Sequence, residues 1–324
     1  MLQRTHASAI QRSLSSAMLT TVMAAALSAC GGGGGSSPAT VSSMSIASSK
    51  PGAPVYGQPV TVTVNGTNLG NLSLTAPGCK NVTRLTAAPT ASTDTTAYFS
   101  CTPSGAYTSS ISAVSNGTTL SQQTLTVPAP IVSMAVSGGG VSGNIIFNLK
   151  GDVAPATVDN FLAYVNAGFY DGADGKGSTI FHRLVNFNDP QSGHFPYAVV
   201  QGGGYLPTTN PDLPPSQTKP ATHDPIQLET GGGKNVQWTA SMARNNLGAQ
   251  TQFFFNVIDN SSSFDTSSGP GYAVFADVSG SAAVITQIFQ ILQTPSACPA
   301  LVGFSDGSCM PVPNVKITSA TQIQ

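Results

Sequence analysis

Short runs of alternating apolar and polar residues fill the chain from about residue 41 to residue 127. Val60–Val64, Leu72–Leu74 and Thr124–Val127 follow this period of two, and Gly, Pro and Asn residues separate the runs. Because successive side chains of a β-strand point to opposite faces, the pattern predicts strands with one buried face and turns between them. We therefore predict a small antiparallel β-sandwich over residues 41–127.

Two later stretches have the period of an amphipathic helix instead. In the first, apolar residues recur at i, i+3, i+4 and i+7 from Val158 to Val165. Pro155 suits the first turn of this helix, and Gly168 follows its last turn. The second stretch covers Ile285–Leu292. Both patterns predict helices that bury one face.

The residues around these helices have the pattern of strands. A stiff linker, Val127–Pro130, separates them from the first domain. Residues 131–149 predict a hairpin that turns at Gly138–Gly140, and further strand-like runs lie at 198–200 and 253–258. Many short strands with two helices predict a mainly β protein whose second domain is a closed antiparallel β-barrel capped by two helices.

The low charge of the chain limits the classes of partner. Its 324 residues carry a net charge of −1, and charged residues make up 8% of the total. This balance offers no basic surface for a phosphate backbone, so it argues against nucleic acid as a partner. Of the five arginines, only Arg183 and Arg244 follow residue 130. Such sparing use suggests that these two side chains act in chemistry or binding.

The N-terminal segment has the pattern of an export signal. Arg4 and Arg12 supply positive charge, and the apolar run Ala17–Leu27 is shorter than the roughly 20 residues that cross a bilayer. The small residues that lead into Cys30 resemble the lipobox of bacterial lipoproteins. The resemblance implies that residues 1–29 are a lipoprotein signal peptide and that Cys30 carries a lipid anchor. An ordinary cleaved signal is the alternative.

A Gly/Ser-rich tether at residues 30–40 follows the predicted anchor. Gly31, and not an acidic residue, comes directly after the cysteine. By resemblance to bacterial lipoprotein sorting, this predicts a protein of the bacterial cell envelope that faces the periplasm from the outer membrane.

The other four cysteines form two local pairs, Cys79 with Cys101 and Cys298 with Cys309. An oxidising compartment permits two disulfides. A zinc site is the alternative, but neither pair has Cys-x-x-Cys spacing or nearby histidines. The spacing therefore favours two structural disulfides.

Short motifs follow one another in a fixed order across the second domain. They are Gly143–Phe147, Ala154–Phe161, Gly168–Gly172, Phe181–Arg183, Val200–Gly203, Ser241–Arg244, Gln252–Phe254 and Gly271–Phe275. Each motif is weak alone, but the ordered set resembles the cyclophilin-type peptidyl-prolyl cis-trans isomerases. The resemblance implies an isomerase domain at about residues 131–294 with a cyclophilin-like barrel.

The resemblance implies a role for each matching residue. Rotation of an X-Pro bond crosses a barrier of about 18–20 kcal/mol, and a donor aimed at the prolyl nitrogen favours the twisted amide. By resemblance, Arg183 is that donor, Gln201 holds the substrate amide, and Phe254 is the floor of the proline pocket. These three are the implied catalytic residues, and the reaction needs no cofactor and no metal. The implied substrate-binding residues are His182, Val199, Ala243, Arg244, Gln252, Phe264 and Tyr272.

Several of these residues have alternative interpretations. His182 is alternatively a packed or orienting histidine, because the reaction needs no general base. At least one side chain of Phe253–Phe255 belongs to the core, because three aromatics in a strand point to both faces. Arg244 alternatively forms a surface ion pair. Gly202–Gly204 and Gly231–Lys234 lack the context of a phosphate-binding loop and are better interpreted as turns.

The chain also departs from the family pattern. The connection between Arg183 and Gln201 is longer than is usual, and Ala198 stands where the family has an aromatic residue. The tail at 295–324, with its cysteine pair, is interpreted as a C-terminal extension of the barrel. The aromatic residues that are candidates to replace the missing wall are Phe187, Phe195 and Tyr197.

We therefore expect a monomeric isomerase that acts on X-Pro bonds of exported, proline-containing polypeptides and assists their folding in the cell envelope. One alternative is a barrel that binds proline-containing chains without turnover. Another places the function in the N-terminal sandwich, which loosely resembles bacterial immunoglobulin-like modules, as an adhesin or envelope scaffold.

Overall fold

The computed structural model describes residues 37–48, 52–230, 233–266 and 270–324. The predicted signal peptide and Cys30 lie outside these residues, as does most of the predicted tether.

The chain divides into two units, Met1–Ser37 and Pro38–Gln324, and every described strand and helix belongs to the second unit. Within the described ranges, no helix combines the length and the apolar character needed to cross a membrane.

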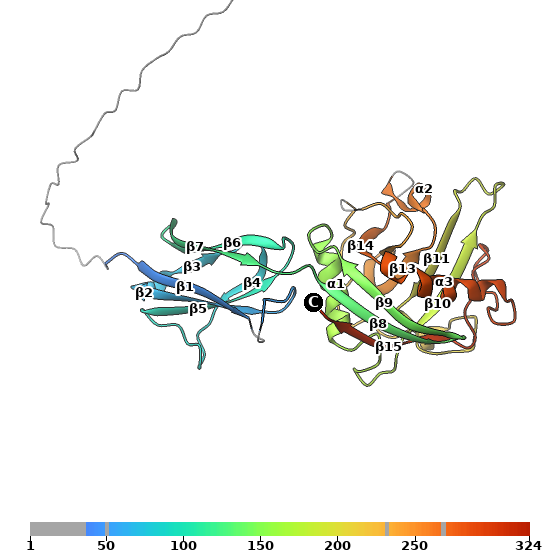
Figure 1. The fold of residues 1–324 in the computed structure, drawn as a ribbon, viewed down its shortest axis with the longest axis horizontal. Helices are drawn as coiled ribbons and strands as arrows, with labels where there is room; N and C mark the ends of the chain where they lie inside the picture. The colour runs from blue at the N-terminus through green and yellow to red at the C-terminus, as the bar shows by residue number, and fades with distance from the viewer. Residues whose placement is uncertain (1–36, 49–51, 231–232, 267–269) are drawn as a thin grey trace, which may run out of the picture. The chain divides into compact units, whose positions relative to one another are not determined.

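Seven strands form two antiparallel sheets in the N-terminal part of the second unit (Figure 1). One sheet has the strand order β1-β2-β5-β4, and the other has the order β3-β6-β7. A short 3-10 helix, η1 (Leu69–Asn71), lies between β2 and β3. The strands are β1 (Thr40–Ser48), β2 (Val60–Thr67), β3 (Ser73–Thr75), β4 (Cys79–Arg84), β5 (Thr96–Pro103), β6 (Thr108–Ser115) and β7 (Thr118–Thr126).

These strands bury alternate residues, as the period of two predicts. On β2, Val60, Val62 and Val64 are fully buried, whereas the threonines between them are half-buried. The predicted disulfide Cys79–Cys101 is present and joins β4 to β5. The likeness to immunoglobulin-like modules stays a prediction.

Eight strands of the second domain close into an antiparallel barrel with the order β10-β11-β13-β12-β14-β9-β8-β15 (Figure 1). The barrel and the predominance of strands confirm the predicted fold class. The strands are β8 (Ile131–Gly138), β9 (Val141–Leu149), β10 (Ile180–Phe187), β11 (Tyr197–Gly202), β12 (Thr239–Asn245), β13 (Gly248–Asn256), β14 (Ala273–Asp277) and β15 (Val315–Gln322).

The two predicted helices are also present. The first predicted helix is α1, which begins at Pro155, and Gly168 follows it with a φ of +68° that favours glycine. The second is α3, continued by 3-10 turns at both ends. A four-residue helix, α2, has no counterpart among the predicted elements. The helices are α1 (Pro155–Asn166), η2 (Pro215–Gln217), α2 (Ser261–Phe264), η4 (Ser279–Ser281), α3 (Ala282–Gln290) and η5 (Ile291–Gln293).

The last strand, β15, corrects the predicted end of the barrel domain at residue 294. β15 pairs with β8 from Lys316 to Gln322 and with β10 through Val315 and Lys316, so it closes the barrel. Val315 and Ile317 are fully buried. The sequence hides this strand because only a short apolar alternation follows a stretch rich in Pro, Gly and Ser. The segment 295–324 is therefore not simply an extension of the barrel.

Aromatic side chains fill the interior of the barrel. Phe253 of β13 lies 5.6 Å from Phe147 of β9, and Phe161 of α1 lies 4.9 Å from Phe275 of β14, measured between ring centroids. All four side chains are fully buried. These aromatic contacts hold α1 against the barrel. The outer face of β10, β11 and β13 is not part of this aromatic core.

The N-terminus of α1 is capped by Glu229, the single glutamate of the chain. Its carboxylate accepts hydrogen bonds from the backbone N–H of Ala156 and of Thr157, at 3.1 and 2.6 Å. The hydroxyl of Thr157 donates to the same carboxylate at 2.7 Å. A negative charge at this position accepts hydrogen bonds from otherwise unpaired N–H groups and interacts favourably with the positive end of the helix dipole.

Candidate active site

Arg183 lies on β10 beside a shift in the register between β10 and β11. Its Nη1 donates to Oε1 of Gln201 on β11 at 3.0 Å. Nε2 of Gln201 in turn donates to Oε1 of Gln252 on β13 at 2.9 Å. Because β11 pairs with both β10 and β13, three adjacent strands bring these side chains into one polar row. The row fixes the orientation of both amides relative to the guanidinium.

The three consecutive phenylalanines of β13 divide between two environments. Phe253 and Phe255 belong to the barrel core, whereas Phe254 belongs to a separate apolar cluster with Val185 and Val199. The division follows from the alternation of side chains along a strand. It places Phe254 on the same side of the sheet as the polar row.

A cavity of about 140 Å³ lies beside the polar row. Phe254, Phe264 and Tyr272 pack edge to face around it, with ring centroids 5.1–5.5 Å apart. A cavity with aromatic walls and a guanidinium at its rim can bind a ligand in which a small apolar ring is attached to a polar group. The residues that line the cavity are Arg183, Val199, Gln201, Ala243, Arg244, Phe254, Phe264 and Tyr272.

Arg244 holds the segment that carries Tyr272. Its Nε donates to the carbonyl of Gly271 at 2.9 Å, and its guanidinium lies 5.5 Å from the centroid of the Tyr272 ring. Over the described ranges Arg244 has no carboxylate partner, so the structure does not support the alternative of a surface ion pair.

A buried amide network supports the same wall of the cavity. Asn235 is fully buried, and its Nδ2 donates to the carbonyl of Phe264 at 3.1 Å and to Oδ1 of Asp265 at 2.9 Å. Ser241 donates to Oδ1 of Asn235 at 2.7 Å. The network ties β12 to the end of α2 and so fixes the position of the Phe264 ring.

His182 is a packed residue in this structure. It is buried, its ring lies 4.6 Å from that of Tyr205, and it does not line the small cavity. Burial lowers its pKa to about 3, and the neighbouring charge of Arg183 acts in the same direction. His182 is therefore neutral at ordinary pH. This geometry agrees with the alternative of a packed histidine and not with direct contact to substrate.

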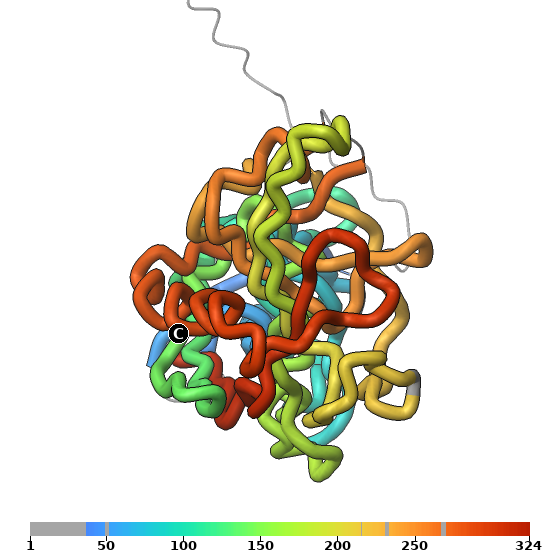
Figure 2. Tube along the Cα trace, turned by 90° about the vertical axis from the view of Figure 1, so that its right-hand side faces the viewer, coloured from blue at the N-terminus to red at the C-terminus, as the bar shows by residue number. Residues whose placement is uncertain are grey.

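Three residues of a C-terminal loop contact Arg183, and no sequence motif indicates them. Nη2 of Arg183 pairs with Oδ2 of Asp306 at 2.5 Å, and Nε donates to Oγ of Ser308 at 2.8 Å. The guanidinium also lies 5.0 Å from the centroid of the Phe304 ring. Figure 2 shows this loop, in red, beside the β10–β11 hairpin, in yellow-green. The one sequence signal for the loop is its cysteine pair, which forms the predicted disulfide Cys298–Cys309.

Asp306 is the most heavily bonded group of the loop. Burial acts to raise the pKa of its carboxyl, but hydrogen bonds from Ser308 and Tyr197 and the charge of Arg183 outweigh burial, so the pKa is lowered. The phenol of Tyr197 donates to Oδ2 at 2.8 Å. Burial and then the neighbouring carboxylate raise the pKa of Tyr197 to about 12. At neutral pH the pair is therefore a phenol that donates to a carboxylate.

The lengthened β10–β11 connection extends the strands and supplies aromatic side chains. The hairpin remains paired as far as Phe187 and Tyr197, whose rings stack at 5.1 Å. Tyr197 also lies 5.2 Å from Phe264, whereas Phe195 is 60% exposed. Of the three candidates for the missing wall, Tyr197 contacts the cavity residues directly, Phe187 stacks behind it, and Phe195 stands apart.

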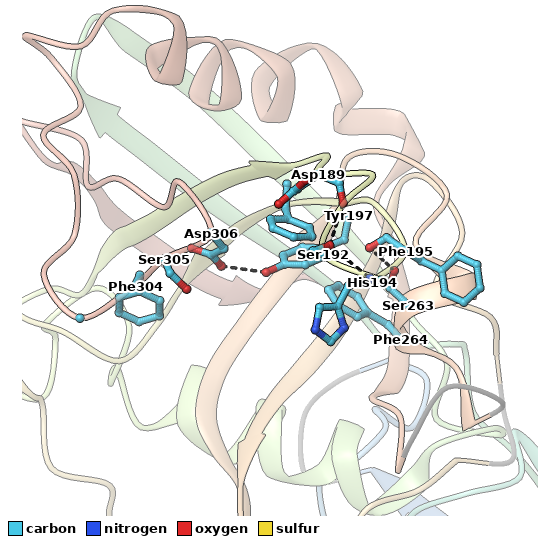
Figure 3. Close-up of a pocket in the computed structure, with 13 residues that line it drawn as sticks. Asp189, Ser192, His194, Phe195, Tyr197, Ser263, Phe264, Phe304, Ser305 and Asp306 are labelled. Carbon is cyan, nitrogen blue, oxygen red and sulfur yellow. Dashed lines mark hydrogen bonds between the residues drawn. The ribbon is translucent and has the colours of Figure 1, made fainter.

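A second, larger cavity of about 880 Å³ adjoins the first (Figure 3). Phe264 lines both cavities, and Asp306 connects the larger one to Arg183. Figure 3 shows the rings of Phe304 and Phe195 on opposite sides, with Tyr197 and its hydrogen bond to Asp306 between them.

The structure brings most of the predicted site residues together. Eight of the ten predicted catalytic and substrate-binding residues line the small cavity. Gln252 is next to it, at the end of the polar row, and His182 is packed away from it. No motif indicated Asp306, Ser308 or Phe304.

Comparison with known proteins gives one consistent result. The model of the family described as cyclophilin type peptidyl-prolyl cis-trans isomerase/CLD matches residues 131–322. Its end lies within β15 and agrees with closure of the barrel by that strand.

Bacterial proteins with related names match the same half of the chain. Peptidyl-prolyl cis-trans isomerase cyp18 of Streptomyces antibioticus is 38% identical over 153 residues, which cover 45% of this chain and 78% of the relative. Peptidyl-prolyl cis-trans isomerase B of Escherichia coli is 36% identical over 152 residues, covering 45% and 78%. Peptidyl-prolyl cis-trans isomerase A of Dickeya dadantii is 37% identical over 161 residues, covering 49% and 72%.

Proposed function

The chain belongs to the cyclophilin-type peptidyl-prolyl cis-trans isomerases, and from this premise we propose how its site accelerates rotation about X-Pro bonds. The small cavity binds the prolyl ring, and Arg183 binds the amide as it twists. The observation that carries the proposal is one guanidinium at the rim of an apolar cavity floored by Phe254, with the amide of Gln201 fixed beside it.

The guanidinium acts on a charge distribution that exists only in the twisted amide. In the planar amide the nitrogen lone pair is delocalised, and rotation localises it on the prolyl nitrogen. A donor at that atom therefore binds the transition state more strongly than the substrate and raises kcat. Arg183 uses three of its five N–H groups within the protein and keeps two for this purpose. The apolar walls strengthen the interaction by lowering the local dielectric.

The remaining residues orient the substrate. Phe254, Phe264 and Tyr272 offer ring faces and edges to the prolyl ring. Gln201 and Gln252 stand beside it as amides whose orientation the polar row has fixed, so they bind the substrate backbone without further ordering.

The larger cavity extends the site beyond the proline. It shares Phe264 with the small cavity, and the rings of Phe195 and Phe304 are 60% and 47% exposed. We expect residues that flank the proline to bind there, so peptides with a large apolar flanking residue have a lower KM than peptides with glycine. Phe195→Ser should remove that difference and leave the rate on the glycine peptide unchanged.

The role of Arg183 is tested by an isomerisation assay on an X-Pro peptide, either coupled to a protease or followed by NMR exchange. Arg183→Ala should lower kcat/KM by about 10²–10³, the loss typical of one transition-state donor. Arg84→Ala is the matched control, because it removes a guanidinium from the N-terminal sheets and should leave the rate unchanged. An Arg183→Ala variant as fast as the wild type, with both no faster than the peptide alone, would support proline binding without turnover.

We propose further that the clients are exported polypeptides and that the protein assists their folding in the cell envelope. Two disulfides, an N-terminal segment with the pattern of an export signal and a cysteine in a lipobox-like context support this location. We propose that the protein is a monomeric, lipid-anchored protein of the outer membrane that faces the periplasm.

The anchor is tested by mass spectrometry of the protein extracted from membranes. The mature chain should begin at Cys30 with a diacylglyceryl adduct, and Cys30→Ser should release the protein into the soluble fraction. An unmodified Cys30, or a mature chain that lacks it, would refute the anchor and leave the isomerase proposal intact.

A further inference from the structure

The loop closed by Cys298 and Cys309 forms a second set of contacts to the arginine of the site. Asp306 and Ser308 accept from Nη2 and Nε of Arg183, and Ser308 donates to Oδ1 of Asp306 at 2.5 Å. These three hydrogen bonds link the side chains of Arg183, Asp306 and Ser308 in a closed ring. We propose that Asp306 and Ser308 are positioning residues that set the orientation of Arg183 for isomerisation. The inference rests on the proposed function, in which Arg183 is the donor to the twisted amide.

The geometry indicates positioning and not simple blockage of the site. Nε and one N–H on each terminal nitrogen are engaged, by Ser308, Gln201 and Asp306. Each terminal nitrogen therefore keeps one N–H. Arg183 still lines the small cavity, and its side chain is 18% exposed. All three nitrogens of the guanidinium are hydrogen-bonded within the protein, and two N–H groups remain for the substrate. Arg183 can therefore donate to the substrate without a change of rotamer.

The loop is itself held in register with Arg183. Leu184, the next residue on β10, exchanges two backbone hydrogen bonds with Cys309, at 2.8 and 2.9 Å. Cys309 directly follows Ser308 in the chain and is joined to Cys298 by the disulfide. Backbone hydrogen bonds therefore join strand β10 to the loop at the residues that directly follow Arg183 and Ser308.

The carboxylate of Asp306 is held from other directions as well. Tyr197 donates to Oδ2 at 2.8 Å, and the backbone N–H of Ser308 donates to Oδ1 at 3.1 Å. These bonds keep the pKa of Asp306 low against the effect of burial, so the group stays charged at neutral pH. A fixed anion of this kind restricts a side chain that is otherwise free to adopt many rotamers.

The test is a set of variants at Asp306 in the full chain. Asp306→Ala should lower kcat about tenfold with little change in KM, because small misplacement of a catalytic group costs rate and not ground-state binding. Asp306→Asn keeps an oxygen acceptor for Nη2 and should recover part of the rate, which a purely structural role would not predict. Asp224→Ala is the matched control, because it removes an exposed carboxylate and should leave kcat unchanged.

A second pair of variants separates this inference from the proposed function. In an Arg183→Ala background, Asp306→Ala should cause no further loss, because the group on which it acts is gone. If Arg183→Ala is slow but Asp306→Ala is as fast as the wild type or faster, the positioning role is overturned and the proposed function stands. If the wild type itself does not accelerate isomerisation, the proposed function fails first.

The disulfide Cys298–Cys309 gives an independent test of the positioning role. Cys298→Ser combined with Cys309→Ser should lower kcat in the same direction as Asp306→Ala, and the two changes should be less than additive. Cys79→Ser combined with Cys101→Ser removes the disulfide of the N-terminal sheets and should leave kcat unchanged. Equal rates for the two disulfide variants would contradict the role of the loop.

Discussion

At the scale of single residues, neighbours in one strand have different tasks. Phe254 lies at the small cavity, whereas Phe253 and Phe255 pack in the barrel core. Alternation along a strand explains the division, so substitutions at adjacent positions should have different consequences.

Phe254→Leu should lower kcat/KM by roughly twofold to twelvefold, equivalent to about 0.5–1.5 kcal/mol of aromatic contact with the prolyl ring. Phe255→Leu keeps the cavity intact and should lower the free energy of unfolding instead. Isomerisation kinetics and denaturant unfolding of both variants check this. A loss of activity in Phe255→Leu that matches the loss in Phe254→Leu would contradict the division.

The burial of His182 predicts how stability varies with pH. Its pKa is lowered to about 3 by burial, whereas an unfolded chain has a histidine pKa of about 6.5. The contribution of His182 to stability is therefore complete above about pH 6.5 and is lost progressively as the pH falls toward 3. Across that window the slope approaches about 1.4 kcal/mol per pH unit.

His182→Phe should flatten the fall in unfolding free energy between pH 6.5 and 4, as measured by urea unfolding at several pH values. The rate should show no inflection near pH 6.5 in either protein. An inflection that disappears in the variant would mean that His182 titrates during turnover.

At the residue scale, the sequence motifs predicted which side chains lie together, and they missed contacts that come from far along the chain. Arg183, Gln201 and Phe254 meet as the family motifs imply. Asp306 lies more than one hundred residues after Arg183, in a segment without a motif. The disulfide that the sequence predicts closes this loop, but the pairing of Leu184 with Cys309, which brings the loop to β10, has no sequence signal.

At the scale of elements, the periodicity of apolar residues predicted both long helices but did not reveal the short helix α2. α1 and α3 carry apolar stripes at helical spacing, whereas α2 has four residues and too few turns to show a period. The β10–β11 connection looked like an inserted loop in the sequence. It proved to extend the hairpin and to place Tyr197 against Phe264.

The cap of α1 gives a prediction at this scale. Glu229→Gln keeps the shape of the side chain but removes the charge that accepts hydrogen bonds from Ala156 and Thr157. We expect a loss of about 0.5–2 kcal/mol in the free energy of unfolding, with kcat unchanged. Thermal unfolding measures it, and Asp224→Asn, which removes an exposed charge elsewhere in the domain, is the comparison. Equal stability of the two variants would exclude a capping role.

At the scale of the whole molecule, the barrel depends on the last residues of the chain. β15 pairs with β8 and β10, and without it both strands become open edges. A chain that ends at Asn314 should therefore fail to form the cooperative barrel, as judged by its near-ultraviolet circular dichroism and amide exchange. A chain that ends at Ile323 keeps β15 and should fold normally. A cooperative unfolding transition of the barrel in the shorter chain would contradict this dependence.

The disulfide Cys298–Cys309 also bears on when the molecule acquires its full speed. A newly made chain has thiols at these positions, and its loop is held to β10 by hydrogen bonds alone. On the positioning role inferred above, such a chain is a slow isomerase, and oxidation converts it into a fast one. The same polypeptide would then work at a reduced rate while these thiols are reduced and reach its full rate only in a compartment that oxidises them.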